Sequence, residues 1–297
     1  MKKYFFVVGI FLLCLVMPFG ATAFAYSQVV GFGDSLSDNG NADGWGLHIA
    51  SNGPVWLDHL AGPGLLNTEF LDMAYFSAQT NYHPGSDSVE WGFRWQINQY
   101  INKVAAGVAD SNALYTLWIG GNDLFNIATP SDAPAVIENA VTHIALGIND
   151  LVIAGAQNIL VMNMPNLGIT PLMNGQNGGP DHSADGAQLA SSFNKALHEA
   201  LNPYRSTINL FEVDVLTIMG ELITDGYFDN YTNKLKDNFL TTDSYMFWDD
   251  IHPTTYAHGL IAKAAYNEVA SVPIPGAIWL FGSGLVGLAG FRKKFKL

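Results

Sequence analysis

The chain has 297 residues, of which 49% are hydrophobic and 13% are charged, so it can bury a sizeable core in one large domain or two small ones. Its formal net charge of −13 at pH 7 argues against nucleic acid and anionic lipid surfaces as partners. The single cysteine excludes a fold held together by internal disulfides.

Residues 1–25 have the pattern of a secretory signal peptide. Two lysines form a basic start, an apolar run extends over Tyr4–Phe19, and the segment ends in ATAFA, a small-x-small cleavage site. A transmembrane helix is the weaker interpretation, because the apolar run is short and Pro18 breaks it. We therefore expect cleavage after Ala25 and export to the periplasm, the cell surface or the medium.

The first predicted strand after the leader is Val29–Phe32, and it runs directly into the polar stretch GDSLSDNGN. This stretch cannot form a core. It is either a simple turn, with Asn39 and Asn41 fixing it, or a device that presents Ser35 at the end of a strand for chemistry.

An irregular segment follows, from about Asn39 to Lys103. It is rich in aromatic residues and holds four of the seven tryptophans, namely Trp45, Trp56, Trp91 and Trp95. These side chains form either an aromatic-lined insertion over a site or part of the ordinary core, and the core is the expected place for most of them.

Apolar strands alternate with helices in the rest of residues 26–271, which we interpret as one domain. Further strands are predicted at Leu114–Ile119, Ile159–Met162 and Ile208–Val213, with helices from Pro134 to Leu151, from about Ala184 to Leu201, and from Thr254 to Ala270. This alternation predicts an α/β fold with three layers, α/β/α, around a central mostly parallel sheet. In such sheets the site lies beyond the carboxyl ends of the strands.

The turn after the second predicted strand, GGND (Gly120–Asp123), offers the side-chain amide of Asn122. Acyl transfer through a tetrahedral intermediate needs hydrogen-bond donors aimed at the developing oxyanion. Gly120 and Gly121 leave room for a substrate to approach. The motif alone is weak, since such clusters are usually turns, but its place at a strand end brings it to the same edge as Ser35.

A histidine and a carboxylate that could activate Ser35 occur together in FWDDIHPTTYAHG. Pro253 restricts His252 to an extended backbone, which fixes the direction of its ring. Asp249, three residues earlier, can fold back to accept the Nδ1–H bond and leave Nε2 for the serine. Asp250 is the competing carboxylate, although two residues is an awkward separation for reaching Nδ1.

A metal site built on His252, His258 and the neighbouring aspartates is the alternative for this stretch, since these residue types bind zinc. The spacing fits no familiar zinc pattern, and the sequence offers no clear third ligand. We therefore expect no metal and no organic cofactor.

Residues 272–297 form an apolar segment with a basic end. No charged residue occurs from Ala277 to Gly290, and Arg292 and three lysines follow, an arrangement typical of a stop-transfer helix. The span Pro275–Phe291 would be about 25 Å long, short of the roughly 30 Å hydrocarbon core, so it would be a marginal permanent anchor. Without the two end segments, residues 26–271 (the body of the chain) keep seven basic and 26 acidic residues. Their net charge of −19 favours solubility.

This tail resembles the PEP-CTERM sorting tail, with a Pro-x-Pro signature, a short apolar helix and a basic end; Ile274 replaces the usual glutamate. The resemblance implies a stage in the membrane, recognition by an exosortase-type protease, and then release or transfer to the cell surface. A plain tail anchor is the alternative.

The body resembles the GDSL or SGNH hydrolases. FGDSLSDNGN is similar to the first block of that family, GGND to its third and WDDIHPT to its fifth, in the expected order, and the resemblance covers about Val29 to Val269. NMPNLGITP looks like a stretch common in the branch with secreted lipases and phospholipid–cholesterol acyltransferases. The resemblance implies a flavodoxin-like fold and a serine ester hydrolase.

By this resemblance Ser35 is the nucleophile, His252 the base and Asp249 its partner. Asn122 and the backbone N–H of Ser35 would be oxyanion donors, and Asp34 and Gly121 would support the site. The second block departs from the family pattern: in MAYFSAQT (Met73–Thr80), Phe76 and Ser77 stand where glycines are expected. A backbone N–H survives any side chain except proline, so we assign the remaining donor to Ser77.

The sequence is compatible with more than one substrate class. A lipase fits the aromatic segment, a carbohydrate acetylesterase fits the sorting tail, and an acyltransferase differs only in whether water or an alcohol deacylates the enzyme. A non-catalytic surface protein that kept the fold for binding is the alternative of another class.

Overall fold

The computed structural model describes residues 26–41, 50–81, 91–176, 178–235 and 245–270. The predicted leader and sorting tail lie outside these residues, as does Trp45. The described chain holds a five-stranded sheet of order β2-β1-β3-β4-β5, in which each neighbouring pair is parallel. Its strands are β1 (Gln28–Gly33), β2 (Glu69–Asp72), β3 (Leu114–Trp118), β4 (Asn158–Met162) and β5 (Asn209–Val213).

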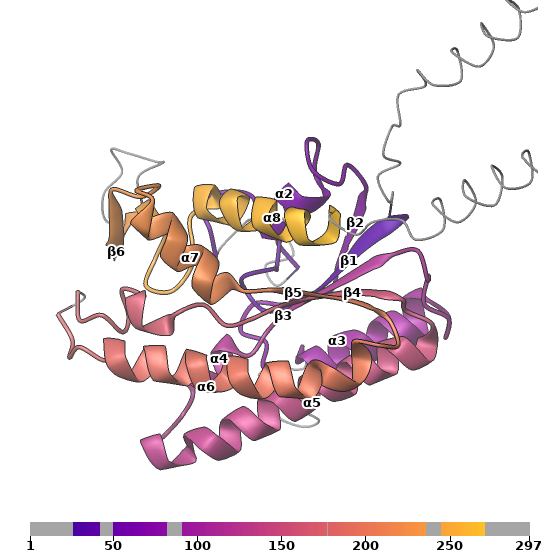
Figure 1. Cartoon of the computed structure of the whole chain (residues 1–297), viewed down its shortest axis with the longest axis horizontal. Coiled ribbons are helices and arrows are strands. Elements are labelled where there is room, and N and C mark those ends of the chain that lie inside the picture. Colours follow the sequence, from indigo (N-terminus) through magenta and orange to yellow (C-terminus); the bar gives the residue numbers. More distant parts are fainter. Residues whose placement is uncertain (1–25, 42–49, 82–90, 177, 236–244, 271–297) are drawn as a thin grey trace, which may run out of the picture.

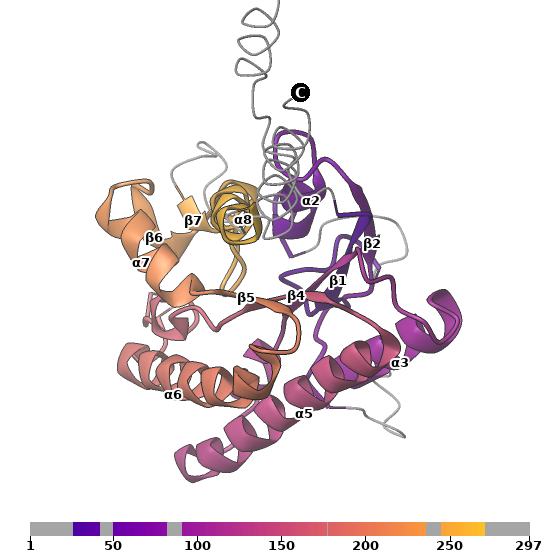
Figure 2. The ribbon, with the colours of Figure 1, turned by 45° about the vertical axis from the view of Figure 1, so that its right-hand side comes forward.

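Helices cover both faces of this sheet, as Figures 1 and 2 show from two directions. One face carries α3 (Phe93–Gln99), α5 (Ala133–Ala154) and α6 (Ser183–Leu201). The other carries α2 (Trp56–Ala61), α7 (Val215–Thr224) and α8 (Thr255–Ala270). The predicted three-layer α/β/α architecture is therefore confirmed.

The alternation of side chains along β3 explains why the strands could be recognised. Tyr115 and Leu117 join the core beneath α5 and α6, whereas Leu114 and Trp118 join the core beneath α2 and α8. Successive side chains of a strand point to opposite faces, and here both faces are covered. Every residue of β3 is buried, which produces a continuous apolar run in the sequence.

The predicted irregular segment contains regular structure. It supplies the edge strand β2 and the helices α2 and α3, and Trp56 is fully buried with its ring edge-on to Trp118. Trp91 and Trp95 instead form a cluster with Tyr75. The segment is therefore part of the sheet and its cover, and only part of its aromatic content is core.

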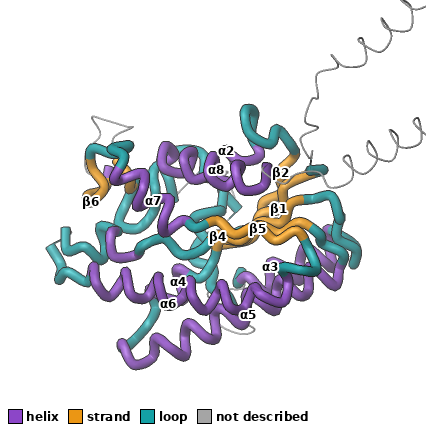
Figure 3. Tube along the Cα trace, viewed as in Figure 1, coloured by secondary structure: helices purple, strands orange, loops and turns teal. Residues whose placement is uncertain are grey.

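Short elements complete the described chain (Figure 3). They are the helix α4 (Gly121–Phe125), the π-helical turn η1 (Tyr100–Val104), and the 3-10 turns η2 (Pro130–Asp132), η3 (Leu167–Ile169) and η4 (Asn202–Tyr204). A two-stranded sheet of β6 (Asn230–Lys234) and β7 (Tyr245–Phe247) is also present. The helical stretch Pro130–Ala154 has the length and composition of a membrane span. Its apolar side packs in the core beneath the sheet, as in an amphipathic core helix.

Candidate active site

Four segments of the chain meet at the carboxyl edge of the central sheet. Ser35 follows β1, and Asn122 lies in α4 just after β3. Met164 follows β4, and His252 comes from the loop between β7 and α8. All four residues line one cleft, which is where a parallel sheet is expected to place its site.

Ser35, His252 and Asp249 form a continuous chain of hydrogen bonds. His252 Nε2 lies 2.8 Å from Ser35 Oγ, and Nδ1 lies 2.8 Å from Asp249 Oδ2 and 2.9 Å from Oδ1. Ser35 is 6% exposed and His252 is 5% exposed. The contacts expected from the spacing are therefore present, with the carboxylate on Nδ1 and the serine on Nε2.

The loop that carries the histidine is organised around Asp249. Asp249 Oδ1 accepts the backbone N–H groups of Ile251 at 3.0 Å and His252 at 2.9 Å. Burial acts to raise the pKa of Asp249, but the hydrogen bond and charge of His252 and these N–H donors outweigh it and hold that pKa below its usual value. Asp249 is thus kept ionised beside the imidazole.

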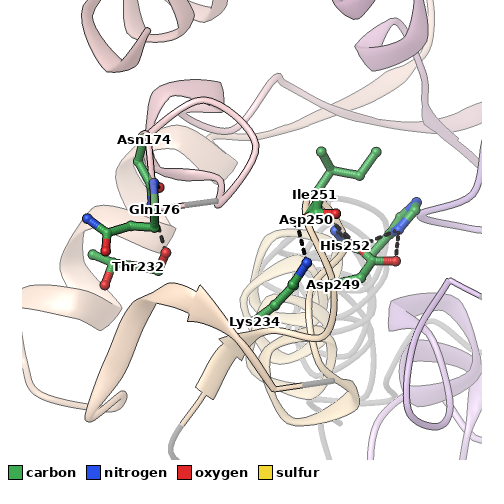
Figure 4. Close-up of polar contacts among 8 residues, drawn as sticks. All are labelled: Asn174, Gln176, Thr232, Lys234, Asp249, Asp250, Ile251 and His252. Atoms are coloured by element: carbon green, nitrogen blue, oxygen red, sulfur yellow. Dashed lines mark hydrogen bonds and ion pairs between the residues drawn. The ribbon is translucent and has the colours of Figure 1, made fainter. Parts of the chain in front are cut away.

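Asp250, the competing candidate for the partner of His252, forms an ion pair with Lys234 instead. Its Oδ1 lies 3.0 Å from Lys234 Nζ at the end of β6. Figure 4 shows the Asp249 carboxylate against the His252 ring and Lys234 against Asp250. The backbone carbonyl of Asp250 also accepts the N–H of Leu172 at 2.9 Å, which ties this loop to the one after η3.

Two buried aspartates, Asp34 and Asp38, stabilise the turn that holds Ser35. Asp34 accepts the N–H of Leu36 on its side chain and those of Ser37 and Asp38 on its carbonyl, as expected of a residue that shapes the turn. Burial raises the pKa of Asp34 to about 7. Asp38 accepts the N–H groups of Gly40 at 2.8 Å and Asn41 at 2.6 Å.

The GGND stretch opens the helix α4 and is bound to the second block. Gly120 has φ of +115°, and a Cβ there would meet the Phe193 ring at 2.7 Å, so this position needs glycine. Gly121 lines the cleft and faces Asp34. Asn122 Nδ2 donates to the carbonyl of Ala78 at 2.9 Å.

Asp123 also links the GGND stretch to the second block, Met73–Thr80. Its carboxylate accepts the backbone N–H of Thr80 at 3.0 Å and the Thr80 hydroxyl at 2.6 Å. No role was predicted for Asp123, although its place directly after the strand-end amide Asn122 could have suggested one.

Ser77 has the backbone conformation that a glycine would adopt, with φ of +62°. It is exposed, and it is not among the residues that line the cleft. It precedes Ala78, the partner of the Asn122 amide. The assignment of its N–H as an oxyanion donor therefore stays a prediction.

The walls of the cleft are largely apolar. Besides Asp34, Ser35, Gly121, Asn122 and His252, the cleft is lined by Leu36, Trp118, Phe125, Met164, Pro165, Asn166, Leu167, Thr170, Met219, Phe247, Ile251 and Pro253. Asn194 on α6 holds one wall in place, because its amide both accepts from Met164 N at 2.7 Å and donates to Met164 O at 2.8 Å. A buried serine–histidine pair with a partly buried carboxylate, beside an apolar cleft, can perform nucleophilic acyl chemistry.

The alternative metal site finds no counterpart in the part of the chain that the structure describes, where no three His, Cys, Asp or Glu side chains gather in a way that could hold an ion. His258 is fully buried in α8 and does not line the cleft.

A family model described as GDSL-like Lipase/Acylhydrolase matches residues 29–265. Among characterised proteins, the phosphatidylcholine-sterol acyltransferase of Aeromonas hydrophila is 25% identical over 346 residues, covering 91% of this chain and 98% of its own. Lipase 1 of Photorhabdus luminescens is 23% identical over 378 residues, covering 93% of this chain and 57% of the lipase. The acetylesterase of Thermothelomyces thermophilus is 25% identical over 210 residues, covering 63% of this chain and 69% of its own.

Solved structures agree in fold. A member of the lipolytic G-D-S-L family from Veillonella parvula has a TM-score of 0.50 at 14% identity, covering 82% of this chain and 99% of its own. A catalytic mutant of an acetylxylan esterase from Geobacillus stearothermophilus has a TM-score of 0.50 at 12% identity, with 83% and 95% covered. At these identities the likeness shows the fold alone.

Proposed function

The chain belongs to the GDSL-like lipase/acylhydrolase family and is a carboxylic ester hydrolase, and on that premise we propose that it cleaves esters through an acyl-enzyme intermediate on Ser35. The observation that carries the proposal is the hydrogen-bonded chain from Ser35 Oγ through His252 to Asp249.

In the acylation step, Ser35 Oγ attacks the ester carbonyl carbon while His252 Nε2 takes the hydroxyl proton. Asp249 holds the Nδ1–H tautomer and stabilises the imidazolium that forms. The tetrahedral intermediate then collapses, the C–O bond to the alcohol breaks, and the alcohol leaves with the proton from Nε2. The products of this step are a free alcohol and acyl-Ser35.

The oxyanion is stabilised by hydrogen-bond donors at the strand ends. An amide nitrogen carries two hydrogens, and Asn122 Nδ2 uses one of them for Ala78 O, which leaves the other for the oxyanion. We assign the remaining donors to the backbone N–H groups of Ser35 and Ser77. The left-handed backbone at Ser77 supports this assignment, since it reproduces the conformation of a glycine.

Deacylation repeats these steps with water as the nucleophile: His252 takes a proton from water, the carboxylic acid forms, and Ser35 recovers its proton. If an alcohol replaces water, the same site transfers the acyl group instead. The relatives named as acyltransferase, lipase and acetylesterase support ester chemistry and leave both outcomes open.

We further propose that the chain is exported by its leader and held or processed through its C-terminal tail. The basic, apolar and small-residue pattern of residues 1–25 supports export. The apolar segment with a basic end supports a membrane stage with an exosortase-type protease as partner.

The experiment that tests the proposal compares the purified chain with Ser35→Ala on nitrophenyl acetate and nitrophenyl octanoate. We expect hydrolysis by the unsubstituted chain, loss of it in the variant, and labelling of Ser35 by a fluorophosphonate. Equal background rates for both proteins, together with an unlabelled Ser35, would leave a non-catalytic binding protein on a hydrolase fold.

A further inference from the structure

A second, larger groove lies next to the cleft. It opens between the N-terminal parts of α5 and α6, which diverge from each other toward these ends in Figure 1. The groove encloses about 720 Å³, whereas the room left beside Ser35 is about 40 Å³. Sites for small organic ligands span roughly 300–1,000 Å³, so the groove has the size of a binding site and the cleft alone does not.

The groove and the cleft share part of their walls. Phe125, at the end of α4, and Leu167, at the start of η3, line both. Phe125 is partly exposed, so its ring is accessible at this boundary. Phe125 and Leu167 therefore form the boundary between the cleft at Ser35 and the groove.

Apolar side chains make up most of the walls of the groove, and Thr129, Gln188 and Ser192 add polar groups to them. Its walls include Ile127, Ala128, Pro134, Ile137, Leu172 and Leu189. Leu172 is 47% exposed, so its side chain offers accessible apolar surface at the groove. Among the lining residues the ionisable ones are His182 and Asp185, which face each other at 3.2 Å and are both exposed.

We propose that this groove binds the acyl chain of the ester substrate, and that it gives the enzyme a preference for medium or long acyl chains over acetyl. The inference rests on the proposed function. A fatty acyl chain fits better than a sugar residue, because the interior offers apolar carbon surface, and a sugar needs hydrogen-bonding groups along its length. Each methylene buried in the groove contributes up to roughly fourfold in kcat/KM.

The test narrows the groove from two sides. Ala128→Trp places a large ring in it from an exposed position between α4 and η2, and Leu189→Trp does so from α6. Ile153→Trp is the matched control, because Ile153 is 76% exposed on α5 and does not line the groove. The substrates are nitrophenyl esters of acetate and octanoate.

We expect the unsubstituted chain to hydrolyse the octanoate with at least a tenfold higher kcat/KM than the acetate. Ala128→Trp should lower the ratio of octanoate to acetate by about tenfold or more, and Ile153→Trp should leave it unchanged. An acetate preference in the unsubstituted chain, or a ratio unaffected by both groove variants, would overturn the proposal.

A binding measurement separates this proposal from the proposed catalysis. In the Ser35→Ala background, dodecanoate should bind, as followed by titration calorimetry, and Ala128→Trp should weaken that binding about tenfold. If the unsubstituted chain hydrolyses no ester but this binding pattern is observed, the catalytic proposal is contradicted and the proposal of an acyl-binding groove stands. Equal dodecanoate affinity with and without the tryptophan would refute the groove whatever the activity.

Discussion

Asp38 Oδ2 accepts a hydrogen bond from the backbone N–H of Phe76 at 2.7 Å. The carboxylate thereby joins the turn that carries Ser35 to the loop that carries Ser77, since its other oxygen holds Gly40 and Asn41. The ring of Phe76 lies in turn 5.9 Å from that of His252. One buried side chain thus sets the distance between the nucleophile and a proposed oxyanion donor.

We predict that Asp38→Asn lowers kcat about tenfold and changes KM little. The amide can accept with only one oxygen, so a charge-assisted bond to a backbone N–H is lost, and a loss of about 1.4 kcal/mol in the transition state corresponds to tenfold. Steady-state kinetics on a short ester would show the split. A rise in KM at constant kcat would instead indicate a role in substrate binding.

A second prediction separates two adjacent carboxylates. Asp249→Asn should lower kcat by on the order of 10³–10⁴-fold, because an amide at Nδ1 favours the wrong tautomer of His252. Asp250→Asn should cost at most a few-fold, since its partner is Lys234 in a partly exposed ion pair. Thermal unfolding of both variants would show that the chains are folded. Equal losses of kcat would contradict the assignment of Asp249.

The sequence could predict those parts of the fold that carry a repeated apolar pattern. The strands β1, β3, β4 and β5 and the helices α5, α6 and α8 begin and end within a few residues of their predicted bounds. The strand β2 was missed because it is an edge strand with partly exposed residues, so EFLD shows no continuous apolar run. The helices α2 and α3 have only six and seven residues, too few to establish a period.

Some contacts of the site could be predicted from the sequence and others could not. The bond between His252 and Asp249 was predictable because the residues are three apart and Pro253 restrains the backbone between loop and helix. The bonds of Asp38 to Phe76 and of Asn194 to Met164 were not, because each joins segments at least 30 positions apart that meet only through tertiary packing. The groove beside Phe125 likewise arises from the divergence of two helices.

The third prediction concerns pH. Burial, with further contributions from the nearby carboxylates of Asp38 and Asp58, raises the pKa of Asp72 to about 8, against the bonds donated by Asn39 and Ala74. The folded state therefore holds this proton more tightly than the unfolded chain does. The resulting stability is present at low pH and is lost as the pH rises through about 8.

We expect the melting temperature to fall by a few degrees between pH 6 and pH 9, and Asp72→Asn to reduce that fall. Calorimetry across this range would measure both slopes. Asp225→Asn removes an exposed carboxylate and should leave the slope as it is. An equal slope in the Asp72→Asn variant would mean that other groups carry the pH dependence.

The last prediction uses the left-handed backbone of Ser77. A non-glycine residue at φ of +62° costs roughly 1–2 kcal/mol relative to a relaxed backbone, and glycine adopts this conformation without that cost. Because only the backbone N–H is proposed to act on the oxyanion, Ser77→Gly should keep kcat within about twofold. It should also raise the free energy of unfolding by about 1 kcal/mol, reduced in part by the greater freedom of glycine in the unfolded chain.

Ala106→Gly provides the matched control, because Ala106 has φ of +49° just after η1, outside the cleft. Both variants should gain stability in denaturant unfolding, whereas Ser77→Pro, which removes the N–H and cannot adopt a positive φ, should lose both stability and activity. A large loss of kcat in Ser77→Gly would mean that the serine side chain itself takes part, since the backbone donor is still present in that variant. The comparison thus separates the side chain of Ser77 from its main chain, which no substitution to a larger residue can do.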